Sequence, residues 1–146
     1  MKILPLLIAP ALLALPACAP CRDAEKSPLL KGTKFHSAFV ATFGSGQKIP
    51  LSATELDRLV QLLGECRECI PNDPPELMIS YDHKYVVHFQ SGPKPRIEDN
   101  GVLFASDRSL VHARCAKPGT KRAIRQLLDK HIDELDAGAR RQKTLY

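Results

Sequence analysis

An amphipathic helix that begins near Ser52 is the feature that most constrains the fold of this chain. Ser52 and Glu55 have the S-x-x-E spacing of a capping box, and Leu51 before the cap can pack against Leu56. The apolar residues that then recur at helical spacing are Leu56, Leu59, Val60, Leu63, Cys66 and Ile70. This pattern predicts a helix that ends before Pro71, and its apolar face must pack against another layer of the protein.

Five segments are rich in β-branched or aromatic residues and predict strands. They are residues 34–43, 77–81, 85–90, 102–105 and 110–113. In the first segment, alternation places Phe35, Ser37, Phe39, Ala41 and Phe43 on one face, which we expect to be buried. Polar turns at residues 82–84 and 106–109 predict the connections between the later strands, with residues 99–101 as an alternative turn.

A second amphipathic helix is predicted over residues 121–138, and Gly138 marks its end. Its apolar stripe consists of Ile124, Leu127, Leu128, His131 and Leu135, in which His131 fits a half-buried structural histidine. Two such helices among strands predict a two-layer α+β domain, with a largely antiparallel sheet covered on one face by two helices. We expect this domain to span residues 32–138, followed by a flexible basic tail at residues 139–146.

The N-terminal segment predicts export from the cytoplasm. Lys2 precedes an uncharged apolar run over residues 3–15, which is the layout of a secretory signal. A transmembrane helix needs about 20 apolar residues. Because this run is shorter and contains Pro5 and Pro10, a cleaved signal is favoured over a permanent membrane-spanning anchor.

The end of the run, Leu15-Pro16-Ala17-Cys18, resembles the lipobox of bacterial lipoproteins. The resemblance implies that residues 1–17 are removed as a signal peptide. It also implies a diacylglyceryl group on the Cys18 sulfur and an acyl group on its new amine, which together give lasting attachment to a bilayer. Residues 18–31 would form a lipid-anchored tether. A plain secreted protein and an uncleaved anchor are the alternatives.

The same resemblance implies a location in the bacterial cell envelope. Ala19 stands where enteric bacteria place the aspartate that retains lipoproteins in the inner membrane, so the outer membrane is favoured. The domain would then lie in the periplasm or at the cell surface.

The charge distribution argues against a nucleic-acid-binding protein. The formal net charge is +5, but setting aside Lys2 and the three basic residues Arg140, Arg141 and Lys143 leaves 17 basic against 16 acidic residues. A nucleic-acid-binding domain needs a basic face or stripe, and a folded part close to neutral does not predict one.

Five cysteines, Cys18, Cys21, Cys66, Cys69 and Cys115, suggest a disulfide framework. If Cys18 carries lipid, four remain, which in an oxidising compartment could form two disulfides in any of three connectivities. A bond between Cys66 and Cys69 on one helix would close a small loop and constrain little. We therefore favour a long-range bond from Cys66 or Cys69 to Cys115. Cys21 would then bond to the remaining thiol of the pair or fix the tether in place.

The C-x-x-C pair Cys66 and Cys69 raises a redox alternative, thiol-disulfide exchange. Enzymes of that kind place the attacking thiol at a helix N-terminus, where the backbone dipole stabilises the thiolate. Here the pair falls at the predicted C-terminal end of a helix beside Glu65 and Glu68, which disfavours a thiolate. Structural disulfides are the preferred interpretation.

A metal site is the third interpretation. His112 and Cys115 form an H-x-x-C pair that could complete a Cys₃His zinc set with Cys66 and Cys69. The two pairs are far apart in the sequence, and exported cysteines are more often oxidised, so these four residues are weak metal candidates. We expect no cofactor and no catalytic residue.

The sequence therefore predicts an envelope lipoprotein whose small domain is a non-enzymatic interaction or scaffold module. Its expected partners are the membrane, through the lipid on Cys18, and a further envelope protein. The alternatives are a thiol-disulfide oxidoreductase that uses Cys66 and Cys69, or a Cys/His metal-binding module.

Overall fold

The computed structural model describes residues 28–30, 34–43, 46–69, 83–94 and 100–145, which form an α+β domain. Along the chain the elements are β1 (Ser37–Thr42), β2 (Lys48–Pro50), α1 (Ala53–Gly64), β3 (Cys66–Glu68), β4 (Tyr85–Gln90), β5 (Asn100–Phe104), β6 (Ala113–Cys115) and α2 (Pro118–Lys143).

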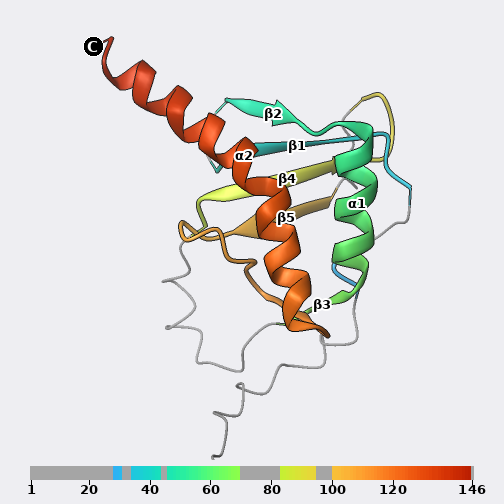
Figure 1. The fold of residues 1–146 in the computed structure, drawn as a ribbon. Helices are drawn as coiled ribbons and strands as arrows, with labels where there is room; N and C mark the ends of the chain where they lie inside the picture. The colour runs from blue at the N-terminus through green and yellow to red at the C-terminus, as the bar shows by residue number, and fades with distance from the viewer. Residues whose placement is uncertain (1–27, 31–33, 44–45, 70–82, 95–99, 146) are drawn as a thin grey trace, which may run out of the picture.

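Two layers make up the domain, as the sequence predicted. One layer is a four-stranded sheet in the order β2-β1-β4-β5, in which every neighbouring pair is antiparallel. The other layer consists of α1 and α2, which lie side by side on the same face of that sheet (Figure 1). A separate two-stranded sheet, β3 with β6, lies at the end of the domain where α1 stops and α2 starts. The expected fold class is confirmed.

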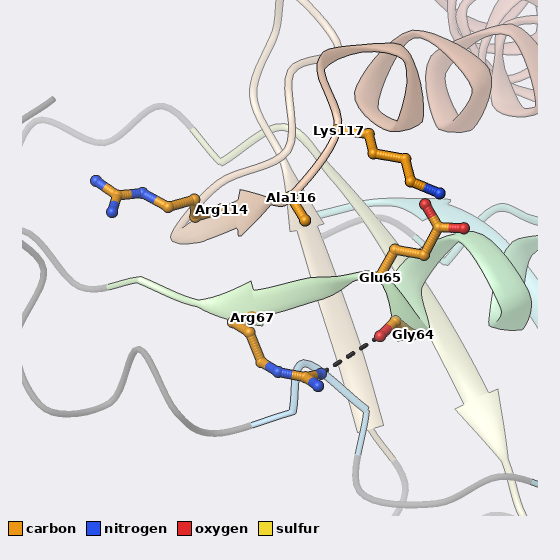
Figure 2. Close-up of a pocket in the computed structure, with 6 residues that line it drawn as sticks. All are labelled: Gly64, Glu65, Arg67, Arg114, Ala116 and Lys117. Atoms are coloured by element: carbon orange, nitrogen blue, oxygen red, sulfur yellow. Dashed lines mark hydrogen bonds between the residues drawn. The ribbon is translucent and has the colours of Figure 1, made fainter.

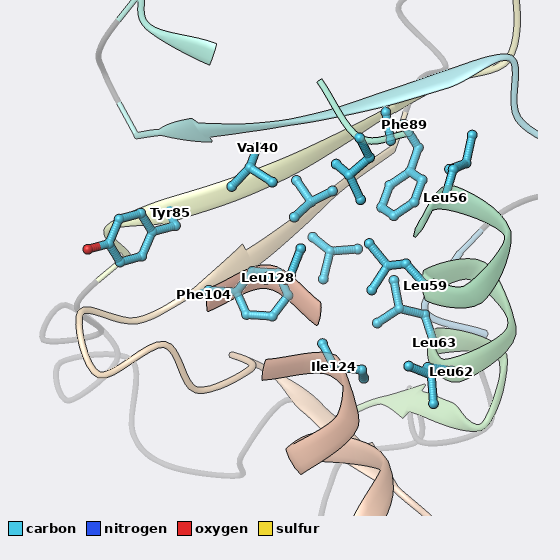
Figure 3. Packing of buried hydrophobic residues seen from close by; sticks show 14 of the residues in the cluster. Val40, Leu56, Leu59, Leu62, Leu63, Tyr85, Phe89, Phe104, Ile124 and Leu128 are labelled. Atoms are coloured by element: carbon cyan, nitrogen blue, oxygen red, sulfur yellow. The ribbon is translucent and has the colours of Figure 1, made fainter. Parts of the chain in front are cut away.

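The core fills the space between the helices and the sheet. Leu59 and Leu63 of α1, and Ile124 and Leu128 of α2, point into the space between the layers, which Phe89 and Phe104 of the sheet also fill (Figure 3). The largest fully buried side chains are Tyr85, Phe89, Phe104, Leu59, Leu63, Ile124, Leu128, Ile132 and Leu135. Full burial of a side chain of this size stabilises the fold by about 1.5–3 kcal/mol, so these contacts hold the two layers together.

The face of β1 that packs on the helices is not the one that the sequence suggested. Ala38 and Val40 are buried, whereas Phe43, expected in the buried row, is 60% exposed; of the expected residues, Ala41 is buried and Phe35 packs against the core. The reason lies on β4, where Phe89 pairs with Ala38 and Val87 pairs with Val40. The small side chain of Ala38 leaves room for the Phe89 ring, so the strand partner decides which face is covered.

Phe39 lies on the opposite face of the sheet. Its ring centroid is 5.0 Å from that of His88, and the Lys48 ammonium is 4.7 Å from the ring. Burial, with a smaller contribution from Lys48, lowers the pKa of His88, which favours the neutral imidazole in this stack.

The first helix is shorter than predicted. It ends at Gly64, and Cys66 belongs to β3 instead of the helix face. Gly64 is a poor helix former, and the backbone after Glu65 turns away to pair with β6. The sequence pattern placed Cys66 on the apolar stripe because a buried strand residue and a buried helix residue look alike at one position. Ile70 lies outside the described residues.

The second helix is longer than predicted. It begins at Pro118, a favoured first position for proline, and continues past Gly138 to Lys143, so residues 139–143, assigned to the tail from the sequence, are helical. Gly138 is buried against the Gln47 side chain. This glycine therefore serves close packing and does not end the helix. The basic residues of the last turn interact favourably with the helix dipole.

The predicted strands differ from the observed ones mainly in their limits. Residues 85–90 form β4 as expected, and residues 102–105 correspond to β5. This strand already begins at Asn100, so Asn100 and Gly101 belong to the strand and not to the alternative turn. Residues 110–112 do not form a strand; Leu110 makes an isolated bridge to Phe104, and Ala113 is the first residue of β6. The three-residue β2 was not predicted, and residues 77–81 lie outside the described residues.

Arg108 fastens the turn after β5 to α2. Its backbone has a φ of 67°, which is uncommon for an arginine, and its guanidinium donates to Asp129 and Asp133. These two carboxylates raise the pKa of Arg108, which favours its charged guanidinium.

The N-terminus of α1 is capped as the sequence predicted, and the cap is joined to α2. Ser52 N–H donates to the Glu55 carboxylate over 2.8 Å, and Glu55 N–H donates to Ser52 Oγ over 3.3 Å. The other Glu55 oxygen lies 3.0 Å from His131 Nε2, and His131 is buried. The hydrogen bond from the Ser52 backbone lowers the pKa of Glu55.

Replacing the cap tests its contribution to stability. We expect Ser52→Ala to lower the free energy of unfolding by about 1 kcal/mol, because one N–H of the first turn loses its acceptor. Urea denaturation at neutral pH measures the change. Thr54→Ala, which changes an exposed residue of the same turn, is the control. A loss as large in the control would contradict the role of the cap.

The pH dependence of stability tests the charge on Glu55. Its pKa is lower in the folded protein than the ordinary value of 4.5, so its stabilising effect is complete above that value. The effect disappears as the pH falls through the lowered pKa. We therefore expect Glu55→Gln to lose less stability than the natural protein between about pH 7 and about pH 3, measured by urea denaturation. Parallel loss in both proteins would rule out this contribution.

Candidate functional site

The small sheet formed by β3 and β6 is the candidate functional site. Cys66 pairs with Cys115, Arg67 with Arg114, and Glu68 with Ala113. Two further backbone bonds extend the pairing, one from Ala116 N–H to Glu65 O and one from Cys69 N–H to His112 O. The hydrogen-bonded region therefore joins the end of α1 to the start of α2.

A disulfide links Cys66 to Cys115 across this sheet. The bond joins residues 49 positions apart in the chain, and the Cys66 side chain is fully buried. The sequence favoured a long-range bond from Cys66 or Cys69 to Cys115, and the structure selects Cys66. The partner was not fixed by spacing, because it depends on the register that pairs these two residues in adjacent strands.

The C-x-x-C pair is not closed on itself. Cys66 is bonded to Cys115, and Cys69 belongs to a second disulfide. The two cysteines lie on and just after a strand, so the expected position at a helix C-terminus was wrong. Cys18 and Cys21 lie outside the described residues. The buried Cys66 sulfur has no access to a thiol in solution, which thiol-disulfide exchange requires.

The four weak metal candidates do not form a ligand set in the structure. Cys66 and Cys115 are bonded to each other, Cys69 is also oxidised, and a disulfide sulfur is not the thiolate that zinc binds. His112 packs against His83, with ring centroids 5.8 Å apart, and burial lowers the pKa of His112. Within the described ranges, no group of three or more His, Cys, Asp or Glu residues could hold a metal ion.

A pocket opens beside the disulfide and is lined by charged residues (Figure 2). Its volume is about 510 Å³, and its lining residues are Gly64, Glu65, Arg67, Arg114, Ala116 and Lys117. Arg67 donates to the Gly64 and Cys66 carbonyl oxygens, each over 3.3 Å. Glu65 accepts a 2.8 Å hydrogen bond from the Thr120 hydroxyl, which fixes its carboxylate toward α2.

The segment that precedes the domain meets it at the same place. Pro28 forms an isolated antiparallel bridge with Arg67, and Leu30, two residues later, is buried in the core. The chain therefore enters the domain alongside β3 (Figure 1). This contact was not predicted, because a single bridge leaves no periodic pattern in the sequence.

The basic residues around this sheet were not predicted as a group. Arg67 and Arg114 lie opposite each other in the strand register, and Lys117 occupies the N-cap position of α2 without a side-chain capping bond. Arg67 lies more than forty positions before the other two residues and comes together with them only through the β3–β6 pairing. The one sequence signal was the run of basic residues after Cys115, at Lys117, Lys121 and Arg122. Across the described part of the chain, neither helix is long and apolar enough to cross a membrane.

Removing the disulfide tests its role in holding the two helices. We expect Cys66→Ala combined with Cys115→Ala to lower the free energy of unfolding by about 4 kcal/mol. Without the bond, the unfolded chain regains the conformational entropy that closing a loop of this length removes. Urea denaturation of the non-reduced protein measures the change. A loss below about 1 kcal/mol, the size expected from trimming a buried side chain, would show that the bond adds little.

Comparison with known proteins gave no similar protein. No family model matches the chain, and neither a curated protein nor a solved structure matches it.

Proposed function

We propose that this chain is a lipoprotein of the bacterial cell envelope and that its domain is a non-enzymatic interaction or scaffold module. The lipobox-like sequence ending at Cys18 would supply the anchor, and residues 19–27 would connect it to the domain. The observation that carries the proposal is the Cys66–Cys115 disulfide, since such bonds persist mainly in exported proteins.

The cysteine count supports lipid on Cys18. Cys66 and Cys115 form one disulfide, and Cys69 is also disulfide-bonded. Of the five cysteines, Cys18 and Cys21 are then the remaining candidates for the partner of Cys69. If the Cys18 sulfur carries a diacylglyceryl group, we infer that Cys69 pairs with Cys21.

A Cys21–Cys69 bond would place a covalent attachment three residues from the anchor. Cys69 directly follows β3, the strand that Pro28 also contacts. The tether would thus be held to the domain at both ends, with a short loop between them. An anchored module held this way keeps a restricted orientation at the membrane, which suits the presentation of a fixed surface to an envelope partner.

The intact mass of the chain, extracted from membranes and alkylated without reduction, tests the proposal. We expect residues 18–146 with a diacylglyceryl and an acyl group and no alkylated cysteine, since four cysteines would be in two disulfides. Cys18→Ala, which removes the acceptor sulfur, is the control and should leave an unlipidated chain.

Two results would contradict the proposal in different ways. A chain without lipid would exclude the anchor. A lipidated chain with two alkylated cysteines would keep the anchor but exclude the second disulfide, and peptide mapping after proteolysis would show which cysteines are free.

A further inference from the structure

We propose that the β3–β6 end of the domain docks onto the anionic phospholipid headgroups of the membrane that holds the anchor. This inference rests on the proposed lipidation of Cys18. It assigns a membrane-facing surface made of Arg67 of β3 and of Lys117, Lys121 and Arg122 at the start of α2. We call these four residues the basic end.

The length of the chain places the basic end near the bilayer. Pro28 is bridged to Arg67, and Cys18 lies ten residues before Pro28. Ten fully extended residues reach at most about 35 Å, and a shorter path brings the domain closer. The end of the domain that contains β3 is therefore the end that the anchor holds next to the lipids.

The charge of this end fits an anionic surface. Arg67, Lys117, Lys121 and Arg122 are all exposed. The acidic residues of β3 and its preceding turn, Glu65 and Glu68, are only partly exposed. Glu65 is also directed to the Thr120 hydroxyl. Basic groups close to a bilayer are attracted by its negative surface potential.

The arrangement of the basic residues adds a second reason. Lys117 is the N-cap residue of α2, Lys121 and Arg122 follow in the first turns of this helix, and its first turn contains no acidic residue. Positive charge is unfavourable at a helix N-terminus, because the backbone dipole is also positive there. Contact with anionic headgroups would offset this unfavourable interaction.

The other basic group of the chain lies too far away to share this surface. Arg140, Arg141 and Lys143 are in the last turn of α2. The 26 residues of this helix span about 39 Å, and Figure 1 shows its C-terminal end pointing away from β3. These three residues therefore provide a control at the opposite end, equal in charge to a triple variant of the basic end.

The test uses the full chain, extracted from membranes and reconstituted into vesicles of phosphatidylcholine alone or with about one third phosphatidylglycerol. Hydrogen exchange is measured by mass spectrometry. We expect exchange over residues 113–122 to be roughly threefold slower in the anionic vesicles, and about 1 M salt, which shortens the Debye length to about 3 Å, to remove the difference.

Charge variants identify the residues responsible. The triple variant Arg67→Gln, Lys117→Gln and Lys121→Gln should lose the difference between the two vesicles. The control, Arg140→Gln, Arg141→Gln and Lys143→Gln, removes the same charge and should keep it. Circular dichroism of both variants reports whether they fold, and single substitutions at Lys117 and Lys121, both exposed, replace the triple variant if it does not.

The outcomes separate this inference from the proposed anchor. A lipidated chain with equal exchange in both kinds of vesicle, or with protection only over residues 138–145, would contradict the docking of the basic end.

A chain without lipid would contradict the proposed anchor, and flotation with anionic vesicles would then test the docking of the basic end. Flotation that is about a hundredfold weaker for the triple variant would support this docking, and a lack of flotation would contradict it. Slower exchange over residues 113–122 on adding an acidic peptide to lipid-free protein, without any effect of vesicles, would assign the surface to a protein partner instead.

Discussion

The pairing of Cys66 with Cys115 in adjacent strands is the constraint on which the rest of this structure depends. It fixes the point where α1 ends and the point where α2 begins, so the two helices leave the same small sheet and lie together on one face of the larger sheet. The buried leucines supply most of the stabilisation, but apolar contacts alone are not directional. The disulfide and its strand pair set the relative position at which those contacts form.

Elements with a strong local signal were predicted well from the sequence. The capping box of Ser52 and Glu55 and the stripe from Leu56 to Leu63 identify α1, and the β-branched run over residues 85–90 identifies β4. Both signals arise between residues near each other in the chain. They were sufficient for the fold class, because two amphipathic helices and an antiparallel sheet have few ways to bury their apolar faces.

Features set by distant residues could not be predicted in the same way. The buried face of β1 depends on Phe89 of β4. Cys66 lies in a strand and not in the predicted helix, because it pairs with Cys115 of β6. Gly138 looked like a helix end but is packed against Gln47. The candidate site shares this dependence, since Arg67 and Lys117 are brought together only by tertiary structure. Cysteine spacing limited the disulfide to a few possibilities, and strand register chose among them.

The edges of the larger sheet have a consequence for the behaviour of the protein at high concentration. At one edge, β2 is only three residues long and carries Lys48 and Pro50. At the other, β5 is partly covered, because Leu110 bridges to Phe104 and Val111 N–H donates to Leu103 O. A strand from another molecule pairs poorly with a short edge that carries a charge and a proline. It also pairs poorly with an edge whose backbone groups are already hydrogen-bonded. Many copies held at a high local concentration can thus remain separate without aggregating through their sheets.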